Sequence, residues 1–403
     1  MNIRTELLVV GGGLAGMALA AICAGVGIET VLVDREDPAR LLDAGFDGRT
    51  TALALGSQRV LAGAGLWPEI AGEAEPIREI RVADADSRHF LHYDHRLVGD
   101  APLGFIVENR VLRRALLSRL AALPNLTHLA PRVVRGVAYG PTTAEAALDD
   151  GGSVRATLVA AADGRLSPLR EAAGIRCVTW TYPQTGIVCT VRHAEPHRGI
   201  AVEHFLPAGP FAILPMTGQR SSIVWTERAD LAPTLLALED AAFADELARR
   251  FGDHLGALEV VGPHWSYPLS FLHAARYVAP RIALIGEAAH VIHPIAGQGL
   301  NLGIRDVAAL AELIVDARRL GLDIGSGPVL EPYERRRRLD AVLLAAATDG
   351  LNRLFSNALP PLQLARDLGL AAVDRLPPLK RLFMRHAMGT LGALPRLARG
   401  EAL

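Results

Sequence analysis

Three glycines near the N-terminus have the spacing of a phosphate-binding turn. Gly11, Gly13 and Gly16 follow a short apolar run at residues 6–10 and precede a segment of small residues at 17–24. In such a turn the first glycine allows the bend, the second lets a pyrophosphate approach the backbone, and the third lets helix and strand pack closely. The free N–H groups at the start of the following helix favour an anion. The pattern predicts a dinucleotide cofactor rather than a structural turn.

An acidic residue stands where the ribose of such a cofactor needs it. Asp34 follows a second apolar run at residues 30–33 and lies 18 residues after Gly16. A carboxylate at this place binds ribose hydroxyls and disfavours a 2′-phosphate. The segment therefore predicts a βαβ unit that holds NAD or the adenosine half of FAD.

Asp163 and Gly164 follow a predicted strand at residues 156–162 and lead into a helix. An Asp-Gly pair taken alone is more often a simple turn. Gly286 and Glu287 end another predicted strand, at 281–285. Each pair alone is weak evidence. We treat the residues at these two strand ends as candidate cofactor contacts because the glycine turn is present in the same chain.

Two histidines precede a further glycine-containing segment. His290 and His293 are candidate metal ligands, but the neighbouring sequence offers no evident third ligand, so we expect no metal site. Residues 294–303 contain Gly297 and Gly299 and lead into a predicted helix at 299–320. The N-terminus of that helix is suited to stabilise negative charge on a reduced flavin ring.

The rest of the chain alternates between helical and strand patterns. Residues 107–123 have apolar residues at helical spacing, and residues 77–95 alternate as in a β-hairpin. Residues 179–270 read as strands interrupted by one helix at 235–250. We predict an α/β fold with a Rossmann-like dinucleotide-binding domain, an inserted β-sheet domain and a helical C-terminus; the resemblance described below implies that the first binds FAD and the second the substrate. The predicted boundaries are 1–75, 103–178 and 272–330 for the FAD-binding domain, 76–102 and 179–271 for the substrate domain, and 331–403 for the helical region.

Composition narrows the class of protein. The 403 residues are 50% hydrophobic and 21% charged, as in a globular protein, and the net charge of -1 argues against nucleic acid as a partner. The three cysteines are too scattered for a disulfide framework. No run of about 18 apolar residues is present to span a membrane. We expect a cytoplasmic protein, with or without peripheral attachment to a membrane.

Longer motifs carry a family resemblance. They are Asp47-Gly48-Arg49-Thr50-Thr51-Ala52-Leu53 with Ser57 and Leu61, His293-Pro294-x-x-Gly297-Gln298-Gly299-x-Asn301-Leu302-Gly303-x-Arg305-Asp306, Tyr333-x-x-x-Arg337-x-x-Asp340, Thr348-Asp349-x-Leu351, Leu354-Phe355-Ser356-Asn357, Arg366-x-x-Gly369-Leu370 and Ala387-Met388-Gly389. With the glycine turn, they resemble the class A flavoprotein aromatic monooxygenases, and most specifically the FAD-dependent hydroxylases of ubiquinone biosynthesis. The resemblance covers nearly the whole chain and implies a fold like that of para-hydroxybenzoate hydroxylase.

The resemblance implies tightly bound, non-covalent FAD and a role for each matching residue. Arg49 would lie by the flavin, Arg110 by the pyrophosphate or ribityl chain, and the Asp163-Gly164 pair would be linked to NAD(P)H use. Glu287 stands where related enzymes usually carry aspartate. The implied cofactor-binding residues are Gly11, Gly13, Leu14, Ala15, Gly16, Asp34, Arg35, Arg49, Thr50, Arg110, Val134, Asp163, Gly164, Gly286, Glu287, Pro294, Gly297, Gln298, Gly299, Leu300 and Asn301.

The implied reaction uses NAD(P)H as a transient reductant and O2. A flavin hydroperoxide would pass one oxygen atom to the ring of a polyprenylated phenol, while the protein supplies position and a dry site. The family gives no catalytic base. His204, on a predicted strand at residues 201–205, is a weak candidate beside the more common case of a packed or surface histidine.

The implied substrate carries a tail that does not leave a membrane readily. Burying one five-carbon unit is worth about 4 kcal/mol at ~0.8 kcal/mol per methylene. The protein must therefore offer an apolar tunnel, dock on a membrane, or join a complex that shields the tail. The C-terminal arginines form either a basic interfacial surface or a solvated face; they are Arg335 to Arg338, Arg381, Arg385, Arg396 and Arg399.

Other functions stay open on the sequence alone. The same fold suits a hydroxylase of a soluble aromatic substrate or a flavin reductase of isoprenoid lipids. A non-catalytic flavoprotein scaffold of a biosynthetic complex is another possibility. A plain NAD dehydrogenase would leave the segments around Asp163 and Gly286 without a role.

Overall fold

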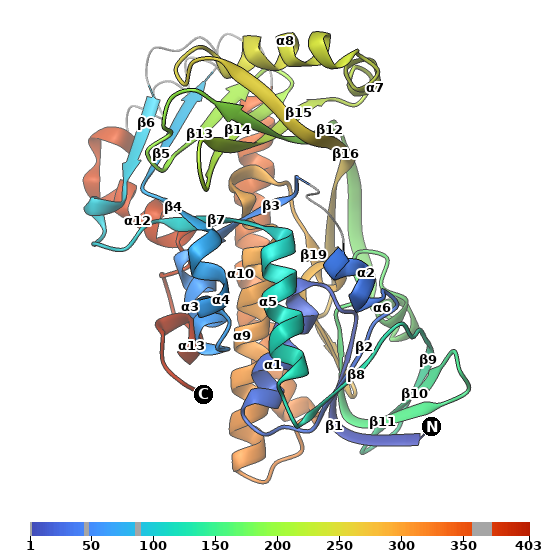
Figure 1. Ribbon diagram of the computed structural model, residues 1–403. Helices are drawn as coiled ribbons and strands as arrows, with labels where there is room; N and C mark the ends of the chain where they lie inside the picture. Colours follow the sequence, from blue (N-terminus) through green and yellow to red (C-terminus); the bar gives the residue numbers. More distant parts are fainter. Residues whose placement is uncertain (1, 44–47, 85–89, 357–372) are drawn as a thin grey trace.

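The computed structural model describes residues 2–43, 48–84, 90–356 and 373–403 (Figure 1). Of the motifs named above, Asp47, Asn357 and the block from Arg366 to Leu370 lie outside these residues.

A largely parallel sheet, called the base sheet below, carries the glycine turn. Its order is β17-β18-β11-β1-β2-β8, with β9 and β10 attached at β11. The strands are β1 (Asn2–Val10), β2 (Thr30–Val33), β8 (Leu126–Leu129), β9 (Val134–Tyr139), β10 (Ala144–Leu148), β11 (Ser153–Ala161), β17 (Val278–Ala279) and β18 (Ile282–Leu284). Helix α1 (Leu14–Gly25) joins β1 to β2, which pair in parallel. The βαβ unit predicted from the glycine spacing is confirmed.

Helix α1 consists of small apolar residues because it is enclosed by other elements. Its residues 16–24 are all buried, against β2, helix α5 (Asn109–Ala121) and helix α9 (Gln298–Arg319). The prediction of a helix at 107–123 is wrong at its start. Residues 104–108 are instead strand β7 (Gly104–Glu108), which pairs with β3 (Thr50–Ala54) and β4 (Ala74–Ile77) in a three-stranded sheet. Helical spacing of apolar residues did not reveal this pairing, because it depends on segments far away in the chain.

A second sheet, called the upper sheet below, forms the other half of the molecule (Figure 1). Its order is β19-β16-β12-β15-β14-β13-β5-β6. The strands are β5 (Glu79–Asp84), β6 (Phe90–Asp94), β12 (Cys177–His193), β13 (Ile200–Leu206), β14 (Gly209–Met216), β15 (Arg220–Arg228), β16 (Leu258–Ala274) and β19 (His290–Val291). The predicted hairpin is β5 and β6, and β5 pairs in parallel with β13. The helix predicted at 235–250 is divided into α7 (Ala232–Leu236) and α8 (Asp240–Phe251).

Two long strands join the halves. β12 and β16 have 17 residues each and pair antiparallel along most of their length, from the base sheet to the upper sheet (Figure 1). At about 3.3 Å per residue each spans roughly 55 Å. The domain boundaries placed at 178/179 and 271/272 fall inside these continuous strands. The division into domains therefore stays a prediction, and the halves are connected by hydrogen-bonded backbone rather than by flexible linkers.

Helix α10 (Gly327–Phe355) is a second connection and crosses the boundary placed at 330/331. It packs on α9, and near its start the Tyr333 hydroxyl donates a hydrogen bond of 2.6 Å to the carbonyl of Leu284 in the base sheet. At its end, Phe355 stacks on Phe205 of the upper sheet with ring centroids 4.2 Å apart. The helix thus fixes the distance between the two sheets.

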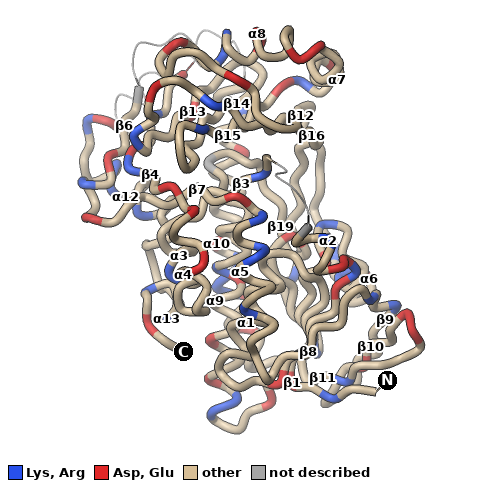
Figure 2. Tube along the Cα trace, in the orientation of Figure 1, with Lys and Arg blue, Asp and Glu red and all other residues tan. Residues whose placement is uncertain are grey.

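The remaining helices are short or lie at the edges. They are α2 (Pro38–Asp43), α3 (Leu55–Gly63), α4 (Trp67–Ile70), α6 (Pro168–Ala172), α12 (Pro377–Ala387) and α13 (Arg396–Arg399). Charged residues of both signs are interspersed along the outer segments (Figure 2).

We expect Tyr333→Phe to weaken the attachment of α10 to the base sheet. The substitution leaves the buried Leu284 carbonyl without its hydroxyl donor, which should lower the free energy of unfolding by about 1 kcal/mol. Leu339→Ala is the matched control, because Leu339 lies on the same helix and is 62% exposed. Denaturant unfolding measures both, and equal stability of Tyr333→Phe and the wild type would contradict the role given to this hydrogen bond.

Candidate active site

A cavity of about 1380 Å³ lies between the two sheets and α10. Ligand pockets commonly measure roughly 300–1,000 Å³, so this one has room for a cofactor and a second ligand. The glycine turn, Gly286 and Glu287, and residues 294–300 line one end. The inner faces of β5, β13, β14 and β15, together with α10 and α12, line the other. The two ends differ in chemistry: backbone N–H groups and glycines at the first, apolar side chains at the second.

The three glycines of the turn have different physical reasons to lack a side chain. Gly11 has φ +109°, and a Cβ on it would lie 2.3 Å from the Ala162 oxygen. A Cβ on Gly16 would lie 2.0 Å from the Gly11 oxygen, so these two glycines permit the chain to pack on itself. Gly13 has nothing within 4 Å of its Cβ position and faces the cavity. The open space at Gly13 fits the approach of a pyrophosphate to the backbone.

The surroundings of the turn also fit the adenosine diphosphate part of FAD. Gly13 is the N-cap of α1 and no side chain caps this helix, so its first N–H groups are available to an anion. The Asp34 carboxylate lies beside the turn, since a Cβ on Gly12 would be 2.0 Å from its Oδ2. A ribose next to the pyrophosphate would thus have a carboxylate within reach.

The opposite wall is the start of α9. Gly297, with φ +60°, precedes the helix, and Gly299 in its first turn has open space at its Cβ position. Asn301, one of the predicted cofactor residues, forms hydrogen bonds with the backbone behind this wall. Its Oδ1 accepts a hydrogen bond from the Ala54 N–H (2.8 Å), and its Nδ2 donates to the carbonyls of Ala52 (2.8 Å) and Gly297 (3.1 Å). Its amide can satisfy three backbone groups there, which explains why it is fully buried.

A buried carboxylate holds the Gly286 turn in place. Asp306 on α9 accepts hydrogen bonds from the Gly286 N–H (3.0 Å), His290 Nε2 (2.6 Å) and Arg337 Nε on α10 (2.7 Å). Burial works against ionisation, but the charges of His290 and Arg337 outweigh it and keep the pKa of Asp306 below its usual value. Sequence reasoning quoted Asp306 and Arg337 only as parts of motifs. Sequence reasoning missed that these two motifs meet in the structure and form a buried salt bridge.

Most predicted cofactor residues line the cavity. They are Gly13, Leu14, Ala15, Gly16, Arg49, Thr50, Gly164, Gly286, Glu287, Pro294, Gly297, Gln298, Gly299 and Leu300. Those outside the lining are Gly11, Asp34, Arg35, Arg110, Val134, Asp163 and Asn301. Contact of any of them with a cofactor stays a prediction.

Several residues outside the lining have structural partners of their own. Asp163 caps α6, because its carboxylate accepts hydrogen bonds from the Ser167 hydroxyl (2.5 Å) and the Leu169 N–H (3.2 Å). Arg110 pairs with Glu108, while Arg113, one turn further along α5, lines the cavity. Arg113 is thus a cavity cation that sequence reasoning did not name.

Arg35 and Val134 lie away from the cavity. The Arg35 guanidinium is exposed beside Glu36, at 3.5 Å, and Val134 begins β9 and packs against the core of the base sheet.

The structure places the candidate base His204 beside the cavity-lining part of β13. His204 lies on β13 but is not among the cavity-lining residues, whereas its neighbours Glu203 and Phe205 are. Val202, two residues before His204 on the strand, does line the cavity. A role of His204 as a base stays a prediction.

The two histidines considered as a metal pair have separate partners. His290 binds Asp306, as described, and His293 Nε2 lies 3.3 Å from Gln184 Oε1. Burial lowers the pKa of His293 to about 4, so it is neutral.

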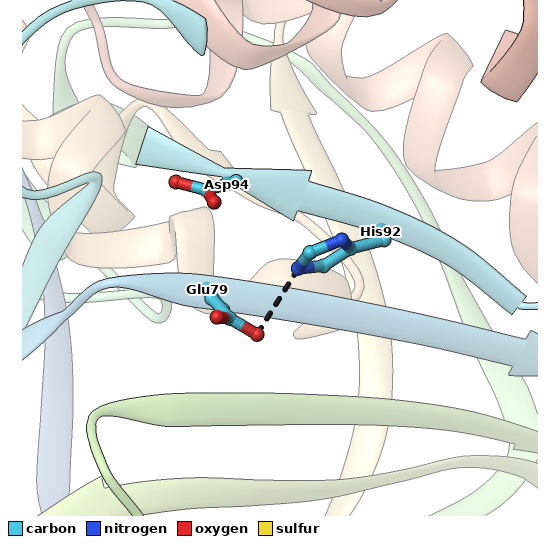
Figure 3. A group of neighbouring side chains, drawn as sticks. All are labelled: Glu79, His92 and Asp94. Carbon is cyan, nitrogen blue, oxygen red and sulfur yellow. Dashed lines mark hydrogen bonds and ion pairs between the residues drawn. The ribbon is translucent and has the colours of Figure 1, made fainter. Parts of the chain in front are cut away.

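Among the described residues, Glu79, His92 and Asp94 are grouped closely enough to hold a cation (Figure 3). Glu79 is paired with His92 (3.0 Å) and Arg81 (3.1 Å), and Asp94 with Arg96 (2.5 Å). The arginines already balance this group's charge, so it is an ion-pair cluster of the hairpin.

Comparisons with known proteins agree with this geometry. The family model described as "FAD binding domain" matches residues 4–345. The chain is 55% identical over 401 residues to ubiquinone hydroxylase UbiL of Rhodospirillum rubrum, covering 99% of this chain and 93% of that protein. It is 35% identical over 390 residues to 3-demethoxyubiquinol 3-hydroxylase of Escherichia coli, covering 96% and 99%. It is 32% identical over 437 residues to the human mitochondrial ubiquinone biosynthesis monooxygenase COQ6, covering 95% and 92%.

The fold also matches solved structures. p-Nitrophenol 4-monooxygenase PnpA of Pseudomonas putida superposes with a TM-score of 0.80 at 20% identity, over 97% of this chain and 100% of that one. PqsL of Pseudomonas aeruginosa superposes with a TM-score of 0.75 at 23% identity, over 92% and 100%. These likenesses establish the predicted fold class.

We expect Gly13→Ala and Gly16→Ala to separate cofactor binding from folding. The Gly13→Ala methyl enters open space, so the stability of the FAD-free protein should not change, while FAD should bind on the order of tenfold more weakly. The Gly16→Ala methyl meets the Gly11 oxygen, so this variant should lose about 1–3 kcal/mol of unfolding free energy or more. Thermal unfolding and FAD titration distinguish the two; unchanged FAD affinity in Gly13→Ala would place the pyrophosphate elsewhere.

We expect Asp306→Asn to be strongly destabilising at neutral pH. It removes one of the two carboxylates paired with the buried Arg337, leaving Asp340 at 2.6 Å, so we expect a loss of about 3 kcal/mol, at the low end for a broken buried ion pair. The folded-state pKa of Asp306 is lowered, so its contribution is present above the ordinary aspartate pKa and is lost as pH falls through the folded value. The difference between variant and wild type in urea unfolding should therefore shrink in acid. A small, pH-independent difference would mean that Asp306 is not ionised in the folded protein.

Proposed function

The chain belongs to the family of FAD-dependent hydroxylases of ubiquinone biosynthesis, and from that membership we propose that it hydroxylates the ring of a polyprenylated ubiquinone precursor. It is an FAD-dependent aromatic monooxygenase. The observation that carries the proposed substrate is the single cavity with a dinucleotide-type turn at one end and apolar walls at the other. FAD, when bound, supplies the redox chemistry and the activation of O2.

The protein's own residues bind, orient and exclude water. The start of α1 and Gly13 would hold the pyrophosphate, with Asp34 at the ribose. The start of α9, at Gly297 to Gly299, would place backbone N–H groups beside the flavin ring and favour negative charge on it. Asn301 ties the start of α9 to β3, and Asp306 ties α9 to the Gly286 turn, and neither residue lines the cavity.

The apolar end of the cavity suits a prenyl tail. Its walls are side chains from the upper sheet and from α10 and α12, among them Ile80, Leu91, Leu214, Leu351, Leu354, Phe355, Phe383 and Met384. At ~0.8 kcal/mol per methylene, each five-carbon unit buried there contributes about 4 kcal/mol. A soluble aromatic acid would gain nothing from these walls, which favours the tailed substrate over that alternative.

We propose NAD(P)H as the transient reductant. The sequence contains one glycine turn of the dinucleotide type, and the FAD adenosine would occupy it. A reductant without such a turn of its own binds only for the transfer of its hydride and then leaves.

We further propose that α12 contacts the membrane that holds the substrate. Leu382 and Phe383 on α12 are each 45% exposed, and Phe383 also lines the cavity. Arg381 and Arg385 on the same helix are placed to meet lipid phosphates. No helix in the described part of the chain meets the length and hydropathy needed to cross a bilayer.

The other C-terminal arginines contribute less to a basic surface than the sequence indicated. Arg337 is buried against Asp306, Arg396 pairs with Glu312 and Asp316, and Arg399 pairs with Glu401.

The proposed function is tested with the purified, FAD-loaded protein. In detergent with NADH or NADPH and O2, a polyprenylated phenol should be hydroxylated, and the same phenol without its tail should have a clearly lower kcat/KM. Mass spectrometry of the product under 18O2 checks the origin of the new oxygen. Faster turnover of the tail-less phenol would overturn the proposed substrate, and a protein that cannot be loaded with FAD would overturn the enzyme itself.

A further inference from the structure

We propose that Glu203 binds the ring hydroxyl of the substrate and accepts its proton during hydroxylation. The inference rests on the proposed function and names a residue for a step that neither the family resemblance nor His204 supplied.

Glu203 lies at the centre of the apolar end of the cavity. It is on β13 with its side chain on the cavity face, between Ala201 and Phe205, which also line the cavity. In the neighbouring strands it is in register with Val82 of β5 and Ala212 of β14, both of them cavity-lining and apolar. The Glu203 carboxyl group thus lies among apolar side chains on this part of the cavity wall.

The strand also places this carboxyl close to the proposed flavin site. Two residues further along β13, Phe205 clusters with Phe355 and with Ile295, which lies in the loop between Pro294 and Gly297. Two residues of strand span roughly 7 Å. A ring held against the flavin loop would therefore have Glu203 within reach of its substituents.

No described residue forms a hydrogen bond or ion pair with the Glu203 carboxyl. Glu227, a buried glutamate of the same sheet, differs in having Arg250 at 3.5 Å and the Arg228 N–H at 2.9 Å. An unpartnered carboxyl in an apolar cavity is destabilising, and such groups commonly mark functional sites. A ligand with a donor hydroxyl would supply the missing partner.

Burial raises the pKa of Glu203 to about 7. The cavity-lining residues of the elements packed against it, β5, β14 and α10, include no titratable or charged side chain within the described chain. Further away on the substrate side, Tyr93, Tyr267 and His386 line the cavity. Burial raises the pKa of both tyrosines and lowers that of His386, so all three are neutral at pH 7.

A carboxylate in this place fits the proton balance of ring hydroxylation. As a ring carbon forms its new bond to oxygen, the O–H bond of the existing hydroxyl breaks and its electron pair moves into the ring. The proton passes to a Glu203 oxygen. The ring regains aromaticity when the hydroxylated carbon loses its hydrogen as a proton, and Glu203 returns a proton to the first oxygen. The oxidant is O2 activated by the family's flavin chemistry: its O–O bond breaks as the C–O bond forms, the second oxygen atom leaves as water, and NAD(P)H supplies the two electrons.

The test is a binding measurement that needs no turnover. A geranylated phenol and its methyl ether are titrated into the oxidised, FAD-loaded protein without NAD(P)H, and binding is followed by the flavin spectrum between pH 6 and 8. An ionised carboxylate accepts the phenol O–H more strongly than a protonated one, so phenol affinity should rise roughly tenfold as pH passes 7. The methyl ether has no proton to donate, and its affinity should be flat with pH.

The variants are Glu203→Gln, Glu203→Asp and the control Glu259→Gln. Glu259 is an exposed glutamate of the same sheet, paired with Arg192. Glu203→Gln should abolish the pH rise in phenol affinity and lower kcat on the order of 100-fold or more. Glu203→Asp should keep part of the rise, and Glu259→Gln should match the wild type.

The outcomes are distinct. A phenol affinity that is flat with pH in the wild type, or a rise that survives in Glu203→Gln, overturns the inference while hydroxylation by the wild type still supports the proposed function. A Glu203-dependent rise without hydroxylation of any prenylated phenol supports the binding role and overturns the proposed substrate. If Glu203→Gln does not fold, the phenol and ether titrations of the wild type and Glu203→Asp still decide the matter.

Discussion

One buried anion organises the cofactor end of this protein. Asp306 accepts hydrogen bonds from the Gly286 N–H in the turn after β18, from the His290 imidazole on β19 and from the Arg337 guanidinium on α10. Removing one member leaves a charge or a donor without a partner in a medium where that is costly. The start of α9 therefore has a fixed place relative to the glycine turn across the cavity. Asn301 likewise connects the start of α9 to β3, through neutral hydrogen bonds with the β3 backbone.

The apolar end of the cavity is held in position by elements that run without a break from one sheet to the other. β12, β16 and α10 each extend from the base sheet to the upper sheet, so the apolar compartment is closed by hydrogen-bonded strands and a packed helix. A cofactor that must react with O2 and an oily substrate needs such a site, since water competes for reactive intermediates. Within this compartment Glu203 is the acidic side chain that lines the wall of the upper sheet.

Local patterns were enough to predict the βαβ unit, the hairpin of β5 and β6 and the start of α9, while the family resemblance added cofactor residues of which most line the cavity. The first three features depend on glycine spacing and short-range periodicity. What could not be predicted depends on distant partners. The pairing of β7 with β3 and β4 altered the start of α5, and the sequence did not show which side chains of β13 line the cavity. The backbone partners of the Asn301 amide and the Asp163 carboxylate are likewise distant or turn-dependent, and contact of either residue with the cofactor stays a prediction.

The account's central claim is that one cavity holds the flavin cofactor at its glycine end and the substrate ring beside Glu203. A crystal structure of the protein with FAD and a short-chain prenylated phenol tests this most directly. The account predicts the pyrophosphate against Gly13, the flavin ring at the start of α9, and the ring hydroxyl within hydrogen-bond distance of the Glu203 carboxyl. A phenol bound outside the cavity, or with its hydroxyl pointing away from β13, would contradict it.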